Sequence, residues 1–166
     1  PQSLHLKWLN GVLLAESGKI EDAIDAYSEI QEINSAIPTV VNNLADLLVT
    51  YRTDAESLAM AVQLAEGLRQ RPQPEFRETY GWVAFKNGDL DTALEWQIPA
   101  ADELIGNALA QFRAGQILGA AGQFDLARAR LSAALEATQP DDISLREQVS
   151  AQLSRLDDLE ASAVLQ

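Results

Sequence analysis

The sequence predicts an all-α fold, a solenoid of about four helix-turn-helix units that is closed by a C-terminal capping helix. The first observation is a spaced triplet of small residues, Gly-x6-Gly-x4-Ala, which begins at Gly11, at Gly81 and, 34 residues later, at Gly115. The second is that 47% of the 166 residues are hydrophobic, enough to bury a sizeable core in one elongated domain. A period of this length is typical of stacked helical repeats.

Each position of the triplet has a physical role in a helical hairpin. A glycine in the place of Gly81 lets a second helix approach closely, and Gly88 can take the left-handed conformation that ends a helix. Ala93 then provides the small contact on the second helix. Each triplet therefore predicts two antiparallel helices joined by a short turn.

The whole chain, residues 1–166, is predicted to be one domain with units at about 4–37, 38–73, 74–105 and 106–140 and a capping helix at 141–166. In the first unit, helices are expected over Leu4–Ser17 and Ile20–Ile33. Their apolar residues recur at three- and four-residue steps, which places these residues on one face of each helix.

The second unit lacks the turn glycine. Its helices are predicted over Val40–Tyr51 and Leu58–Arg71, with Thr53 or Asp54 as the N-cap of the second helix and Met60 in the position of the triplet alanine. The connection between the two helices is therefore expected to be about three residues longer than the other turns.

Pro99 interrupts the pattern of the third unit, which begins at Pro74. A proline inside a helix removes one hydrogen bond and clashes with the preceding turn. The second helix of this unit is therefore expected to kink or end near Ile98, with the turn over Ala100–Ile105 displaced.

The fourth unit, with helices over Ala108–Ala121 and Phe124–Ala137, is the richest in alanine. One more amphipathic helix is predicted over Ile143–Leu165, and it should cover the last apolar face of the solenoid. The N-terminal helix has no such cover. Its leucines should leave an apolar patch that favours some homodimerisation through the N-terminal end, and the start of the sequence is expected to be an excision point from a longer chain.

Composition restricts the possible partners and chemistry. The formal net charge is −13, from 25 acidic and 12 basic residues, which disfavours nucleic acid and anionic lipid as partners. No apolar run is long enough to span a membrane, so no membrane insertion by this chain is expected. The absence of cysteine excludes disulfides and leaves the compartment open.

The search for catalytic residues yields no candidate. His5 is the single histidine, so neither a two-histidine metal site nor a well-supported catalytic triad can be built. The acidic pairs Asp89 with Asp91 and Asp141 with Asp142 stand at helix starts, where carboxylates cap free backbone N–H groups. The sequence therefore predicts no enzyme, no cofactor and no metal.

The triplet, the 34-residue spacing and the succession Asn42-Asn43-Leu44-Ala45 resemble the tetratricopeptide repeat. The resemblance covers about residues 4–140. It implies a right-handed superhelix in which the first helix of each unit lines a concave surface. Within that family, the chain looks like the C-terminal part of long bacterial repeat proteins associated with exopolysaccharide export and protein sorting. This likeness favours a periplasmic or outer-membrane-associated location over the cytoplasm.

The resemblance also implies which positions would touch a ligand in the concave groove. They are Trp8, Asn42, Asp46, Glu78, Trp82, Phe85, Lys86, Phe112 and Gln116. Because the set combines aromatic rings with carboxylates, a protein or peptide partner should be basic or amphipathic. The alternative for the large aromatic residues of the set is packing between neighbouring units.

Two functions stay open at this point. One is a non-catalytic scaffold that binds a protein or peptide in the groove. The other is a structural spacer or self-association module with no groove ligand.

Overall fold

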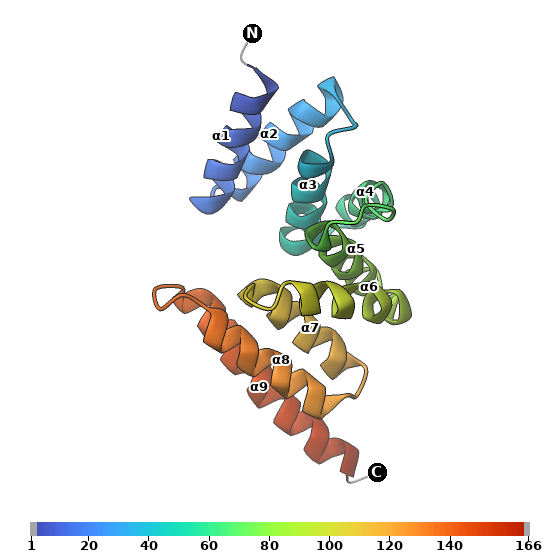
Figure 1. The fold of residues 1–166 in the computed structure, drawn as a ribbon, viewed down its shortest axis with the longest axis vertical. Coiled ribbons are helices and arrows are strands. Elements are labelled where there is room, and N and C mark those ends of the chain that lie inside the picture. Colours follow the sequence, from blue (N-terminus) through green and yellow to red (C-terminus); the bar gives the residue numbers. More distant parts are fainter. Residues whose placement is uncertain (1–2, 165–166) are drawn as a thin grey trace.

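Nine α-helices make up the secondary structure of residues 3–164, the part of the chain that the computed structural model describes (Figure 1). They are α1 (Leu4–Glu16), α2 (Ile20–Ile33), α3 (Pro38–Tyr51), α4 (Ala55–Glu66), α5 (Pro74–Lys86), α6 (Leu90–Glu103), α7 (Ala108–Ala120), α8 (Phe124–Ala137) and α9 (Ile143–Val164). The predicted last residue of the final helix, Leu165, lies outside this range.

The helices form four hairpins that stack along the long axis of the molecule, with the termini at opposite ends (Figure 1). Each of α1, α3, α5 and α7 packs most extensively against the helix that follows it, and α9 packs against α8 and α7. This arrangement confirms the predicted all-α solenoid. We call α1, α3, α5 and α7 the first helices.

The glycine triplets have the roles that their spacing predicts. A Cβ atom added to Gly81 would lie 2.7 Å from the backbone nitrogen of Gln97, so only glycine lets α5 and α6 approach this closely. Gly88 has φ +85°, the left-handed conformation that ends α5, and Ala93 is fully buried.

The glycine-free turn of the second hairpin is not longer than the others, so the predicted insertion is wrong. Three residues connect α3 to α4, as in the other three hairpins. Without a glycine, the chain leaves α3 through Arg52 in an extended conformation (φ −106°, ψ 140°), which any residue can adopt. As a result α4 spans Ala55–Glu66 and not 58–71.

The start of α4 also corrects the register of the second hairpin. Asp54 is the N-cap, as one of the two predicted candidates, and its carboxylate accepts a hydrogen bond from the Ser57 backbone N–H at 2.8 Å. Ser57 stands twelve residues after Ala45, the spacing of the triplet, and is 5% exposed, whereas Met60 is 45% exposed. Ser57, and not Met60, therefore takes the position of the triplet alanine.

The expectation that Pro99 ends its helix is also wrong. The helix α6 runs without interruption through Pro99 to Glu103, and the turn begins only at Leu104. Pro99 lacks the N–H that would donate to the Glu95 carbonyl, but both residues are exposed. Water can therefore hydrogen-bond to this carbonyl, which reduces the cost of an internal proline.

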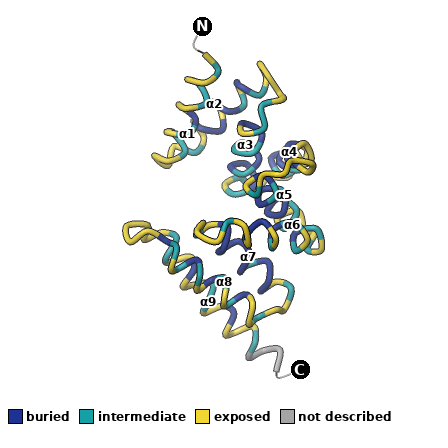
Figure 2. Tube along the Cα trace, in the orientation of Figure 1, coloured by how far each residue is buried: buried dark blue, intermediate teal, exposed yellow. Residues whose placement is uncertain are grey.

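Buried apolar side chains lie between the helices in two clusters. Figure 2 colours the backbone by burial and shows buried positions along most of the stack. The larger cluster extends from α2 to α6 and includes Ile117 of α7. The smaller one joins α7 and α8 to α9, which contributes the fully buried Val149 and Leu156. Between the two clusters, α5, α6 and α7 meet through polar side chains that belong to the site described next.

Candidate functional site

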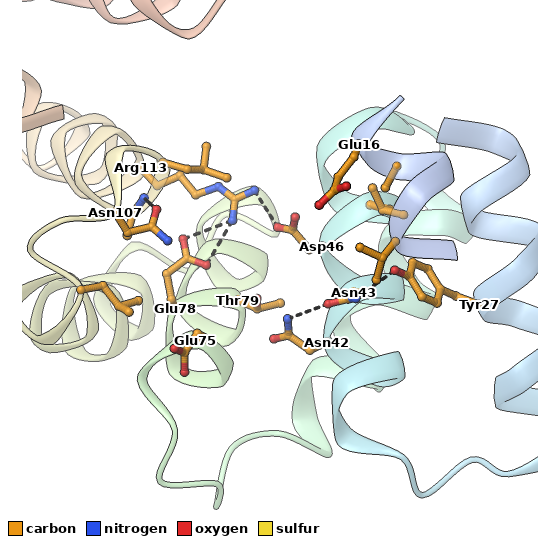
Figure 3. Close-up of a pocket in the computed structure, with 16 residues that line it drawn as sticks. Glu16, Tyr27, Asn42, Asn43, Asp46, Glu75, Glu78, Thr79, Asn107 and Arg113 are labelled. Carbon is orange, nitrogen blue, oxygen red and sulfur yellow. Dashed lines mark hydrogen bonds and ion pairs between the residues drawn. The ribbon is translucent and has the colours of Figure 1, made fainter. Parts of the chain in front are cut away.

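A pocket of about 260 Å³ lies against the first helices of all four hairpins (Figure 3). Its walls combine carboxylates, amides, one guanidinium and apolar side chains. They come from Val12, Ala15, Glu16, Tyr27, Asn42, Asn43, Asp46, Leu47, Glu75, Glu78, Thr79, Leu104, Asn107, Leu109, Ala110 and Arg113.

Arg113 of α7 joins three successive hairpins at one side of the pocket (Figure 3). Its Nη2 lies 2.6 Å from Asp46 Oδ1 of α3, and its Nη1 donates to both oxygens of Glu78 of α5 at 3.1 and 3.2 Å. Its Nη2 also donates to Thr50 Oγ1 at 3.1 Å, and its Cζ lies 4.8 Å from the centre of the Trp82 ring. Five side chains from α3, α5 and α7 therefore form one contact network, which we call the Arg113 cluster.

The cluster is largely buried, which strengthens the electrostatic interactions between its charges. Arg113 is 2% exposed and Glu78 7%, while the Asp46 side chain is 26% exposed and faces the pocket. Burial by itself lowers the pKa of the Arg113 guanidinium, but the charges of Asp46 and Glu78 and the hydrogen bonds to them raise that pKa above its ordinary value. Arg113 therefore stays protonated and serves as the cation of the cluster.

A second polar network, formed by buried amide side chains of α6 and α7, holds Glu78 in position. Gln97 of α6 is fully buried, and its Nε2 donates to Glu78 Oε1 at 3.1 Å. Gln111 of α7 is also fully buried, and its Nε2 donates to the Ala101 carbonyl at 2.6 Å. These amides tie α6 to α5 and α7, so that the Glu78 carboxylate is held in place for Arg113.

On the opposite wall, three polar side chains are connected by a chain of hydrogen bonds. Asn42 Nδ2 donates to Asn43 Oδ1 at 3.4 Å, and Asn43 Nδ2 donates to the Tyr27 hydroxyl at 3.0 Å. Burial raises the pKa of Tyr27. Asn42 Oδ1 is buried and accepts no hydrogen bond from the described residues. A buried acceptor without a donor costs free energy, so this oxygen reduces the stability of the wall.

Comparison with known proteins identifies the fold. No protein-family model and no curated protein sequence matches the chain. Among solved structures, TTC0263, a thermophilic TPR protein from Thermus thermophilus, is similar with a TM-score of 0.68 and 19% identity, over 92% of this chain and 82% of that one. The chain has the fold of tetratricopeptide repeat (TPR) proteins.

Two further solved structures support this assignment. YrrB, described as a TPR protein with an unusual peptide-binding site, gives a TM-score of 0.56 at 20% identity, over 90% of this chain and 76% of that one. MamA from Desulfovibrio magneticus RS-1 gives a TM-score of 0.60 at 17% identity, over 98% and 90% of the two chains. At these identities the comparison concerns the TPR fold alone.

The TPR arrangement brings only part of the sequence-predicted site together. Asn42, Asp46 and Glu78 line the pocket. Trp82 and Phe112 are 7% and 6% exposed, so their rings pack inside the protein, which is the alternative that the sequence left open.

The remaining predicted positions do not line the pocket. Phe85 is half-buried with its ring 5.5 Å from that of Trp82, and the exposed Lys86 lies over the Trp82 ring at 5.6 Å. Trp8 is half-buried and stacks on His5, and Gln116 is partly buried on α7. Within residues 3–164, no group of three or more histidine, cysteine or carboxylate side chains could hold a metal ion, and no helix is both long and apolar enough to cross a membrane.

Sequence reasoning missed Arg113, Asn43, Glu16 and Glu75. A signal for Arg113 was present, because it is the one charged residue of the helix Ala108–Ala120, in which the other residues are small, apolar or amide. A lone charge in such a helix is favoured only where opposite charges meet it. Asp46 and Glu78 occur on the two preceding first helices and were the available partners.

Proposed function

We propose that this protein is a non-catalytic scaffold that binds a basic or amphipathic segment of another protein in the groove formed by its first helices. The observation that supports the proposal is the composition of the pocket. It contains four carboxylates and one cation, and Arg113 already engages Asp46 and Glu78. Glu16 and Glu75 are exposed and have no ion-pair partner among the described residues, so they are available to a positive ligand.

The apolar side chains of the pocket suit the other face of such a segment. Val12 and Leu47 line it on α1 and α3, and Leu104 and Leu109 line it near the start of α7. Apolar contacts supply most of the affinity of a bound segment, while surrounding charges steer a partner of opposite sign. A segment with leucine-like residues on one side and lysine or arginine on the other would meet both requirements.

The likeness to YrrB is consistent with this proposal, since that TPR protein is described as having a peptide-binding site.

Fluorescence anisotropy with two labelled peptides tests the proposal. One is an amphipathic helix former with leucine on one face and lysine on the other, and the second has every lysine replaced by glutamate. We expect the lysine peptide to bind with an affinity that falls with rising salt, and the glutamate peptide not to bind.

A charge-matched pair of variants locates the binding. Glu16→Gln with Glu75→Gln removes two exposed pocket charges, whereas Glu95→Gln with Glu147→Gln removes two exposed charges elsewhere. At about 0.2–1 kcal/mol for each exposed charge pair, the pocket variant should weaken binding roughly 2- to 30-fold. Equal binding of both peptides, or equal weakening by both variants, would contradict a site in this pocket.

A further inference from the structure

A second pocket, of about 190 Å³, lies where the connection between α2 and α3 meets the C-terminal end of α4. Its apolar lining includes Val41, Leu64 and Leu68, which are 8%, 9% and 1% exposed. It shares no lining residue with the pocket against the first helices. Although the chain has 25 acidic residues, no acidic side chain among the described residues lines this second pocket. Its chemistry therefore differs from that of the first pocket.

Among the described residues, Arg71 is the one charged side chain that lines the second pocket. Its guanidinium makes no ion pair and no hydrogen bond within residues 3–164. Glu66, which lines an adjoining hollow together with Arg71, is engaged by Arg69 at 3.4 Å and by the Tyr80 hydroxyl at 3.3 Å. The N–H donors of Arg71 are therefore available to a ligand.

The connection that carries Arg71 is longer than its counterparts. Seven residues, 67–73, join α4 to α5, whereas the other connections between hairpins, and the one to α9, are residues 34–37, 104–107 and 138–142. Leu68 fixes the long connection, because its side chain is buried and its backbone N–H donates to the Ala65 carbonyl at 2.8 Å. The backbone N–H of Arg71 donates in turn to the Leu68 carbonyl at 2.9 Å. The backbone at Arg71 is therefore held beside the pocket, while the side chain stays exposed.

We propose that this second pocket binds a carboxylate that carries a leucine-sized apolar group. Arg71 pairs with the carboxylate through its planar guanidinium, which suits this anion. Gln31, Ser35 and Gln63 line the same pocket, and no hydrogen bond within the described residues uses their side chains, so they can donate to the ligand as well. A cavity of about 150 Å³ can hold a benzene-sized group, so the volume of this pocket suits one apolar side chain. The inference is independent of the groove function.

An NMR titration with N-acetyl-leucine tests the proposal, because this probe has the carboxylate and one apolar side chain. We expect saturable shifts of the Gln31 and Gln63 side-chain amides, with a dissociation constant in the millimolar range that suits a ligand of about twelve non-hydrogen atoms. The side-chain amides of Asn42 and Asn107 in the first pocket should not shift. N-acetyl-leucinamide lacks the charge and acetate lacks the apolar group, so each should bind at least about fivefold more weakly.

A short peptide that ends in leucine separates the two sources of such a carboxylate. If the ligand is the end of a chain, the peptide should bind more tightly than N-acetyl-leucine, because residues before the leucine add contacts. If the ligand is a small free acid, the two should bind equally. Either result supports the site.

Charge variants at exposed positions locate the binding. Arg71→Gln removes the cation, and Gln63→Glu adds a charge of the ligand's sign with nearly the same side-chain shape. Arg155→Gln on α9 is the matched control, because Arg155 is also an exposed arginine and the net charge changes by the same amount. The two pocket variants should weaken binding about fivefold, the upper end for one exposed charge pair, and the control should not. Equal binding of N-acetyl-leucine and its amide, equal affinity in the Arg71→Gln and Arg155→Gln variants, or shifts confined to residues outside the pocket would overturn the proposal.

Discussion

Replacing Arg113 with alanine should be among the most damaging changes to the stability of this protein. The substitution removes the ion pairs to Asp46 and Glu78, the hydrogen bond to Thr50 and the contact with the Trp82 ring. It also leaves carboxylates on two different hairpins without their cation. Three of the four hairpins are therefore affected by one side chain.

The expected loss follows from the burial of the two carboxylates. Removing one partner of a buried ion pair costs about 3–5 kcal/mol, because the remaining charge stays desolvated. Glu78 is 7% exposed and keeps the Gln97 side chain as its one remaining donor among the described residues, so it should incur most of this cost. Asp46, whose side chain is 26% exposed, can be hydrated from the pocket. We therefore expect a loss of about 3 kcal/mol and not twice that amount.

Urea unfolding followed by circular dichroism measures this loss, with Arg155→Ala on the exposed side of α9 as the control, expected within about 0.5 kcal/mol of the unchanged protein. A double-mutant cycle then combines Arg113→Ala with Glu78→Gln. Because Glu78→Gln removes the charge that Arg113 leaves uncompensated, the double variant should be more stable than the sum of the single losses predicts by about 1 kcal/mol or more. An Arg113→Ala loss below about 1 kcal/mol, or strictly additive losses, would refute this account of the cluster.

Three further predictions concern packing and helix ends. Gly81→Ala should lower the free energy of unfolding, measured in urea, by about 1–3 kcal/mol, because the new Cβ meets the backbone of α6. Gly106→Ala should be nearly neutral, because no atom lies within 4 Å of its added Cβ. Equal losses in the two variants would contradict the close approach of α5 and α6. Leu156→Ala should lose about 2–5 kcal/mol and Leu159→Ala, 41% exposed, much less, and the reverse order would contradict the packing of α9. Hydrogen bonds donated by the Ser57 backbone to Asp54 and by Thr92 to Asp89 lower the pKa of each carboxyl below its ordinary value of 3.8. The two ionised caps therefore stabilise the folded protein above that pH, and this contribution is lost as the pH falls through the lowered pKa. Acid unfolding of a variant with both aspartates changed to alanine should therefore depend less on pH below about 3.8 than that of the unchanged protein, and an identical profile would count against the caps.

The repeat could be predicted from the sequence because backbone geometry constrains a few residues directly. Gly81 must be small for α6 to approach, and Gly88 must reach a positive φ. These constraints are local, so the spacing alone located three turns and the helices on either side of them. The second hairpin satisfies the same geometry with an extended Arg52 in place of the turn glycine and with Ser57 in place of the alanine. Because neither residue matches the triplet, the sequence pattern did not locate the start of α4.

The outcome at Pro99 and at the Arg113 cluster depends on tertiary environment and not on local pattern. Pro99 continues α6 because the carbonyl it leaves unpaired lies on the exposed side. Asp46 and Glu78 line the pocket, but both carboxylates are paired with Arg113, which stands 67 residues after Asp46 in the chain. The lone charge of Arg113 in its helix indicated that acidic partners exist, but the structure was needed to show that α3 and α5 supply them.

The most direct test of the proposed groove is the mapping of a bound lysine–leucine amphipathic peptide by ¹H–¹⁵N NMR. The side-chain amides of Asn42, Asn43 and Asn107 line the pocket and report on it separately from the backbone. Binding in the pocket predicts saturable shifts of these three amides and of backbone amides in the first helices, with little change in α9. Shifts confined to the opposite surface, or none at saturating peptide, would contradict the proposed function.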